Sequence, residues 1–196
     1  MQTDLYPGEQ MEKTRALLTI RNKGDRTIDS LLLDGDNLTE FSVTYNGSKL
    51  EYTCPLYFSR GKYNLFRPDK EASDYRLYRL PASLKPGDTA QLEIQSLIAF
   101  KGFQNSYYAM GLLHNGTFFN GGLPGFGYDE GEELRNSDKR KKYGLPVKTV
   151  KDIPQDDPEG RNTIQGQDEA DLLRLDVTVS TDGDQVAVAP GTLEKE

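Results

Sequence analysis

Residues 89–100 read TAQLEIQSLIAF and carry the strongest strand signal in this sequence of 196 residues. Apolar side chains stand at Ala90, Leu92 and Ile94, and polar residues fill the positions between them. A period of two places one set of side chains on the buried face of a sheet and the other set on its solvent face. We predict one long strand over this stretch, a length that favours a wide, curved sheet over a small barrel.

The segments on the N-terminal side of this strand show the same alternation and are separated by turn residues. The clearest is a hairpin, because Asn46-Gly47 supplies the two positive φ angles that a tight primed turn needs. Its apolar face is predicted to consist of Phe41, Val43 and Tyr45 on the way out and Leu50 and Tyr52 on the return. The predicted elements before residue 89 are a short edge strand at 3–7, strands at 14–21 and 27–33, the hairpin over 38–52, and a strand that runs into a Pro86-Gly87 turn.

One helix is predicted, over residues 129–143. Acidic side chains come first in this segment and the basic run 139–142 comes last, which complements the helix dipole. Gly144 fits the position after the helix C-cap, and Pro146 prevents continuation. The helix can break near Ser137, which can cap a second, shorter helix.

The remainder of the chain is predicted to return to strands. A strand is expected at 172–179, and Val186 and Val188 are expected in a last strand. About ten to twelve strands, one helix and no βαβ rhythm predict an all-β fold, an antiparallel β-sandwich or saddle with one helical excursion. We interpret residues 1–196 as a single β domain, with a strand-turn-helix insertion at 112–146 and an acidic loop at 147–170.

The charge distribution excludes one class of partner. The net charge is −7, and residues 152–171 hold seven acids and one base, so the rest of the chain is close to neutral. Nucleic-acid binding needs a basic stripe, so no nucleic-acid partner is expected. The acidic run is interpreted as a solvated loop, with a cation or basic-partner site as the alternative. No apolar run is long enough to span a membrane, and the start lacks the features of a signal peptide.

The inventory of reactive side chains is small. There is one histidine, His114, whereas a histidine-based zinc site needs further ligands, as in H-E-x-x-H, which the sequence lacks. Cys54 is the only cysteine, so no internal disulfide can form, and it is interpreted as a small buried hydrophobe. The glycine-rich stretch 121–127 lacks the Lys-Ser/Thr of a P-loop. We therefore expect no catalytic, metal-binding or cofactor-binding residue in this chain.

Three stretches together resemble one family. Residues 5–33, LYPGEQMEKTRALLTIRNKGDRTIDSLLL, resemble the first strands of the N-terminal β domain of aminopeptidase N-type zinc peptidases. Residues 114–145, HNGTFFNGGLPGFGYDEGEELRNSDKRKKYGL, are similar to a pattern in bacterial members fused to ABC-transporter permease segments. Residues 179–196, VSTDGDQVAVAPGTLEKE, look like the strand pair near the end of the same domain. The order and spacing of the three stretches carry the resemblance.

The resemblance implies a membrane-anchored zinc metallopeptidase whose catalytic domain, with its zinc, lies outside this chain. It implies a non-catalytic domain that docks on its own catalytic domain in cis and shapes one wall of the cleft for a peptide substrate. It also implies a location on the exocytoplasmic side of a bacterial membrane. The alternative that the residues leave open is a free-standing β-sandwich module for adhesion or carbohydrate binding.

Residues 114–145 concentrate glycines, aromatic rings and charge without a nucleophile, a paired base or a metal set. Their composition predicts a strand-turn-helix that leaves the sheet and docks on a neighbour. The candidate interdomain contacts are Tyr128, Glu133, Arg140 and Tyr143.

Overall fold

The computed structural model describes residues 1–35, 38–54, 57–58, 71–72, 74–100, 112–113, 116–117, 122–128, 134–148, 174–189 and 191–195. The chain divides into two compact units, a first unit of Met1–Tyr128 with Asp176–Glu196 and a second unit of Asp129–Leu175. The described residues contain fourteen strands and one α-helix, and the strands form two main antiparallel-rich sheets without a closed barrel. The prediction of an all-β fold with one helical excursion is confirmed. The strand number exceeds ten to twelve because seven strands have only two residues.

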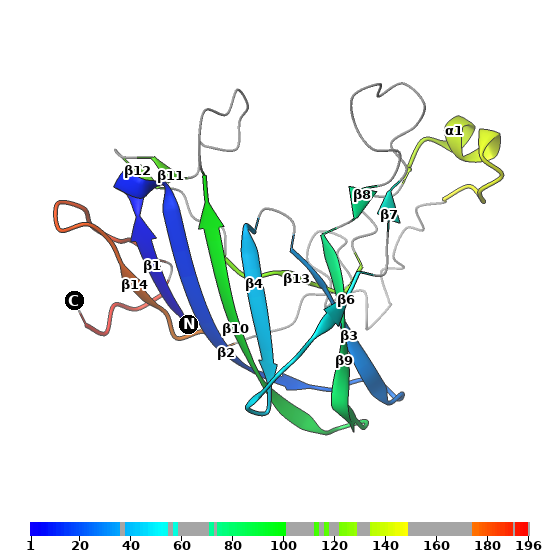
Figure 1. Cartoon of the computed structure of the whole chain (residues 1–196), viewed down its shortest axis with the longest axis horizontal. Coiled ribbons are helices and arrows are strands. Elements are labelled where there is room, and N and C mark those ends of the chain that lie inside the picture. The colour runs from blue at the N-terminus through cyan, green and yellow to red at the C-terminus, as the bar shows by residue number, and fades with distance from the viewer. Residues whose placement is uncertain are drawn as a thin grey trace, which may run out of the picture. The chain divides into compact units, whose positions relative to one another are not determined.

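The first sheet has six strands in the order β14-β1-β2-β10-β4-β5 (Figure 1). The long predicted strand is β10 (Thr89–Ala99), and it pairs antiparallel with β2 (Met11–Arg21) over its whole length and with β4 (Glu40–Tyr45) over part of it. Its alternation is confirmed, because Ala90, Leu92 and Ile94 are buried. The other strands are β1 (Gln2–Tyr6) beside β2, β14 (Thr178–Ser180) parallel to β1, and β5 (Ser48–Lys49) beside β4.

The second sheet has four antiparallel strands in the order β13-β3-β9-β6. Its two long strands are β3 (Ile28–Asp34) and β9 (Tyr75–Leu84), and their register shifts between Ile28 and Ser30. The short strands at its edges are β13 (Gly125–Phe126) and β6 (Tyr52–Thr53). Two small ribbons complete the described strands, β7 (Tyr57–Phe58) with β8 (Glu71–Ala72), and β11 (Leu112–Leu113) with β12 (Gly116–Thr117).

One hydrophobic cluster joins the two main sheets. Apolar burial is the main favourable term in folding, about 1.5–3 kcal/mol for each large side chain. Both sheets contribute fully buried members to the cluster, Val43, Leu92 and Ile94 from the first and Leu33 and Tyr78 from the second. The sheets therefore stabilise each other as two layers of one core.

Arg76 links the two sheets at the edge of this cluster. From β9 its Nη1 donates a hydrogen bond of 2.8 Å to the carbonyl oxygen of Phe41 on β4. Its guanidinium carbon lies 4.0 Å from the ring centre of Phe41 and 4.6 Å from that of Tyr52. A planar cation between two aromatic rings gains cation–π attraction while it satisfies an exposed strand edge.

The predicted hairpin forms, but its return strand is short. Asn46 and Gly47 have φ angles of 46° and 83°, which fits the tight primed turn. Leu50 is buried as predicted. The placement of Tyr52 on the hairpin's apolar face is wrong, because this residue is 48% exposed and pairs with Tyr78 in the second sheet. The chain crosses from one sheet to the other directly after Leu50, so the alternation of the hairpin ends there.

Asn22 closes the turn between β2 and β3 and is buried. Its Nδ2 donates to the carbonyl oxygens of Arg26 at 2.7 Å and Leu84 at 2.9 Å. Its own backbone N–H donates to Asp88 at 3.0 Å, and its carbonyl oxygen accepts from Gly87 at 2.8 Å. One side chain thus satisfies the backbone of two neighbouring turns, as buried polar groups require.

Three strand predictions need correction. The segment at 3–7 is not an edge strand, because β14 pairs with β1 on its outer side. The strand predicted at 172–179 begins only at Thr178, while 172–173 lie outside the described residues. Val186 and Val188 are not in a strand and are 83% and 92% exposed. A sequence that alternates apolar and polar residues forms a strand only where a neighbouring strand provides hydrogen-bond partners and an apolar surface to cover. The described residues provide neither beside Val186 and Val188.

The helix of the second unit is shorter than predicted. α1 spans Ser137–Lys142, residues 134–136 are not helical, and 129–133 lie outside the described residues. The N-cap is Asn136 and not Ser137, because the Asn136 side chain accepts a 2.9 Å hydrogen bond from the N–H of Lys139. The predicted C-terminal stop is confirmed, since Gly144 has a φ of 69° and donates to Lys141 at 3.0 Å. Among the helices of the described residues, none is sufficiently long and apolar to cross a membrane.

Candidate functional site

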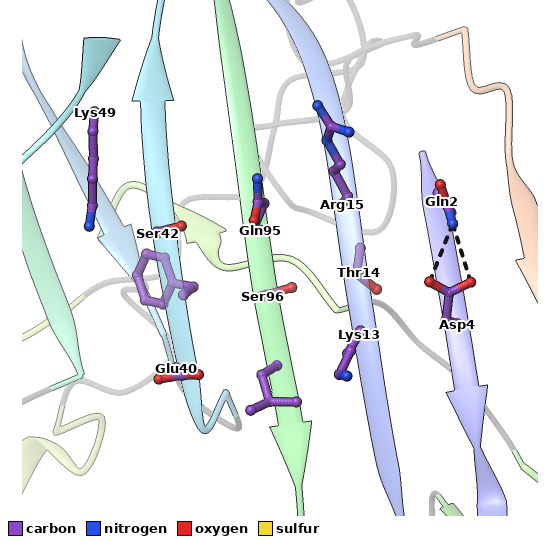
Figure 2. Close-up of a pocket in the computed structure, with 12 residues that line it drawn as sticks. Gln2, Asp4, Lys13, Thr14, Arg15, Glu40, Ser42, Lys49, Gln95 and Ser96 are labelled. Carbon is purple, nitrogen blue, oxygen red and sulfur yellow. Dashed lines mark hydrogen bonds between the residues drawn. The ribbon is translucent and has the colours of Figure 1, made fainter. Parts of the chain in front are cut away.

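The outward face of the first sheet forms a broad polar groove of about 690 Å³. Neighbouring strands place their polar side chains in rows across it, because Gln2 lies opposite Arg15, Arg15 opposite Gln95, and Gln95 opposite Ser42. Figure 2 shows these side chains on adjacent strands and the contact of Gln2 with both carboxylate oxygens of Asp4, each at 3.3 Å. A face of this kind can hydrogen-bond a polar ligand.

One charge in the groove, Arg15, is paired with an acidic side chain beside it. Nε of Arg15 lies 2.8 Å from Oε1 of Glu93, and Nε2 of Gln95 donates to the same oxygen at 2.9 Å. These hydrogen bonds, the one from Gln95 first, lower the pKa of Glu93 below its usual value. Within the described groove, no side chain is arranged as a nucleophile with an activating base.

A second polar group lies on the opposite, buried face of the same sheet. Glu12 on β2 is only 2% exposed, and Oγ1 of Thr14 donates to its Oε1 at 2.9 Å. Since the proton of Thr14 is used in this way, the 3.1 Å contact between Thr3 and Thr14 is donated by Thr3. Burial raises the pKa of Glu12 to about 7, and the hydrogen bond from Thr14 opposes that rise.

Residues 122–128, here named the cross-sheet segment, meet this buried group at Gly122. A Cβ on Gly122 would lie 2.0 Å from Oε1 of Glu12 and 2.6 Å from Oγ1 of Thr14, so only glycine fits there. The Gly122 carbonyl oxygen also accepts a hydrogen bond from the Ser96 hydroxyl. Within the glycine-rich stretch that lacks a phosphate-binding motif, Gly122 thus allows close backbone packing.

The other end of the cross-sheet segment belongs to the second sheet (Figure 1). Phe126 in β13 pairs with Leu33 on β3, and the N–H of Gly127 donates to Leu32 at 2.9 Å. The ring of Tyr128 lies 5.7 Å from that of Tyr75, centre to centre. The segment therefore connects the inner face of the first sheet with the edge of the second.

The four candidate interface residues have different surroundings. Tyr128 and Tyr143 are exposed, and Glu133 lies outside the described residues. Arg140 is buried, and its guanidinium donates to the carbonyl oxygens of Pro146 at 2.7 Å and Leu134 at 2.8 Å. Arg140 thus holds the two flanks of α1 together within the second unit.

The reactive side chains named from the sequence do not form a site in the described structure. His114 lies outside the described residues, and Cys54 is half-buried. In the ranges that are described, no group of three or more His, Cys, Asp or Glu side chains is placed to hold a metal ion. The buried group of Glu12 and Thr14 was not predicted, although both residues continue the phase of Ala16, Leu18 and Ile20 toward the start of β2.

No family model matches this chain, and no curated protein matches it either. Solved structures similar to it are M1 zinc metallopeptidases, matched at low TM-score over about half of the chain. One is the enzyme from Deinococcus radiodurans, with 18% identity and a TM-score of 0.31, covering 50% of this chain and 19% of that chain. Mutants of a two-domain M1 zinc metallopeptidase bound to L-tryptophan (18% identity, TM-score 0.29, 50% and 19% covered) and to L-arginine (17%, 0.30, 53% and 21%) are others.

The matched region spans about a fifth of the length of those solved structures. The similarity is too low to carry an argument about function, which has to come from the residues of this chain.

Proposed function

We propose that this chain is a non-catalytic domain of a larger aminopeptidase N-like zinc metallopeptidase. In this role it docks on a catalytic domain in cis and forms one wall of the cleft for a peptide substrate. The zinc belongs to that catalytic domain, since H-E-x-x-H does not occur in these 196 residues.

The observation that carries the proposal is the convergence of the three stretches that resemble the family. Residues 5–33 supply the end of β1, all of β2, and β3 except Asp34. Val179 and Ser180, from the closing stretch, pair with Thr3 and Asp4 on β1. Gly122, from the stretch 114–145, lies against Glu12 and Thr14 on β2. Parts of all three stretches thus lie in the first unit, on or beside β1 and β2, as expected if they were retained together.

The proposal extends to the setting of the parent protein. We place this domain on the exocytoplasmic side of a bacterial membrane, in a protein whose membrane anchor is an ABC-transporter-type permease. This extension rests on the resemblance of residues 114–145 alone. Fractionation of cells that express the full-length protein tests it, because recovery of the intact protein in the soluble fraction would contradict a permease anchor.

Docking is tested with the catalytic domain expressed separately and mixed with residues 1–196. We expect a complex that Tyr143→Ala weakens, because Tyr143 is 67% exposed beside α1 and is available to a partner. Leu17→Ala is the matched control, since Leu17 is 65% exposed but lies on β2, outside the stretch 114–145. Arg140 is unsuitable for this test, because its hydrogen bonds within the second unit make its removal a change of local structure.

The same preparation tests the division of labour. The isolated chain is expected to hydrolyse no aminoacyl-p-nitroanilide and to bind no stoichiometric zinc, measured by elemental analysis after dialysis. Chelator-sensitive hydrolysis by residues 1–196 would overturn the proposal. A catalytic domain that binds neither the chain nor its Tyr143→Ala variant would leave the docking role without support.

The polar groove keeps the second candidate function in view, a module for adhesion or carbohydrate binding. Gln95 lies in the middle of its rows, between Arg15 and Ser42, where it can hydrogen-bond a sugar hydroxyl. Binding to a glycan array that Gln95→Ala abolishes would favour this module. Absence of glycan binding together with complex formation would favour the peptidase domain.

A further inference from the structure

The inner face of β2 holds a carboxyl group without a charged neighbour in the described part of the first unit. The residues opposite Glu12 on the neighbouring strands are Leu5 on β1 and Ile98 on β10, and its side-chain partner on β2 is the hydroxyl group of Thr14, all neutral. Thr14 itself is flanked by the hydroxyl groups of Thr3 and Ser96, which are neutral too. The other titratable side chains buried in that unit are phenols, which carry no positive charge in either protonation state. These are Tyr45, Tyr75 and Tyr78. The hydrogen bond from Thr14 therefore stabilises a negative charge on Glu12 in part, and burial outweighs it.

The backbone at Gly122 closes this carboxyl off from water. The ideal Cβ position of Gly122 is 2.0 Å from Oε1 of Glu12 and 3.0 Å from Cβ of Thr14, so there is no room between them for a water molecule. The hydrogen bond from Ser96 to the Gly122 carbonyl oxygen holds the backbone in this position. Movement of the Gly122 end of the cross-sheet segment would therefore give Oε1 of a Glu12 carboxylate access to water.

The protonation of Glu12 and the position of the cross-sheet segment are therefore linked. With the segment closed, burial raises the pKa of Glu12 to about 7, and with the segment open the carboxyl returns toward its ordinary value of 4.5. The closed form holds its proton more tightly, so it is favoured at low pH. As the pH rises from about 4.5 to about 7, the ratio of the open to the closed form increases, and above that range the ratio no longer depends on pH.

We propose that Glu12 and Gly122 form a proton-dependent latch. When Glu12 is protonated, the cross-sheet segment stays on the inner face of the first sheet. When Glu12 loses its proton to solvent, the segment detaches at its Gly122 end while β13 remains paired with β3. This device depends on the contact between two residues and not on the function proposed above.

Hydrogen exchange of the backbone amides of Gly122 and Leu123, at the end that detaches, tests the latch in the full chain. After correction for intrinsic exchange rates, we expect the opening equilibrium of wild type to rise roughly a hundredfold between pH 5 and pH 8. Glu12→Gln keeps the shape without the charge, so its equilibrium is expected to change by less than about threefold over the same range. Glu40→Gln, an exposed acid on β4, is the matched control and should behave as wild type.

Two outcomes overturn the latch. One is exchange of the Gly122 and Leu123 amides in wild type that does not depend on pH beyond the intrinsic rates, and the other is Glu12→Gln with the same dependence as wild type. If Glu12→Gln does not fold, a carbon-13 titration of wild type decides. The Glu12 carboxyl carbon and the Gly122 amide must then titrate together near pH 7, whereas titration of Glu12 at its ordinary pKa would refute the latch.

Discussion

Gly122→Ala is the most direct test of the packing between the cross-sheet segment and the first sheet. The added methyl group would lie 2.0 Å from Oε1 of Glu12, 2.6 Å from Oγ1 of Thr14 and 3.0 Å from Cβ of Thr14. The Glu12 side chain can swing aside, but Cβ of Thr14 is fixed by β2, so the backbone at residue 122 has to shift. Overpacking of a well-packed core costs about 1–3 kcal/mol. Alanine also restricts the unfolded chain more than glycine does, which stabilises the folded state by about 0.4–1 kcal/mol. The net loss of unfolding free energy is therefore about 1–2 kcal/mol.

Urea unfolding followed by circular dichroism measures this loss as a lower midpoint with an unchanged slope. Gly125→Ala is the matched control, because its methyl group would lie 3.6 Å from Cβ of Asp34, an ordinary contact. We expect that control to stay within about 0.5 kcal/mol of wild type. A Gly122→Ala protein as stable as the control would refute the close approach of Gly122 to β2.

Three further changes test other parts of the fold. As the pH rises from about 4.5 to about 7, wild type should lose up to about 3 kcal/mol of unfolding free energy, because the pKa of Glu12 is raised to about 7 in the folded protein and only its protonated form is stable there. Urea titrations at several pH values measure this loss, and Glu12→Gln should remove it. Asn22→Ala leaves the carbonyl oxygens of Arg26 and Leu84 without their donor, so it should lower the free energy of unfolding by about 2 kcal/mol or more. A urea midpoint equal to that of wild type would contradict this. Arg76→Lys keeps the positive charge but loses the planar contact with the rings of Phe41 and Tyr52. Thermal unfolding should show a loss of about 1 kcal/mol of unfolding free energy. An unchanged stability would mean that the charge alone holds the two sheets together at that point.

The sequence predicts those strands best whose two faces meet different surroundings. β10 and β4 have an apolar core on one side and solvent on the other, so their alternation is regular and their bounds were predicted within a residue or two. The return from Asn46-Gly47 was predicted too long because Leu50 and Tyr52 keep the same alternation while they belong to different sheets. Periodicity records burial, and it does not record which sheet provides it.

The buried polar group was missed for a related reason. Glu12 and Thr14 occupy inward-facing positions of β2, but they are polar, so a search for alternating hydrophobic residues does not include them. Gly122 was recognised as part of a bend, but the need for glycine arises from a strand more than a hundred residues earlier in the sequence. In α1, charge order located the C-terminal half of the helix, whereas the Asn136 cap sets its start at Ser137.

The parallel pairing of β14 with β1 has a consequence for synthesis on the ribosome. The hydrogen bond between Ser180 and Asp4 joins residues 176 positions apart, and the amino group of Met1 donates to the carbonyl oxygen of Asp176. At a translation rate of about 5–20 residues per second, β1 waits roughly 10–35 s for this neighbour. During that interval the outer edge of β1 is an open template for strands of other nascent chains. We infer that the order of emergence leaves this edge open to aggregation in the cell, and that early capture by a chaperone would act there.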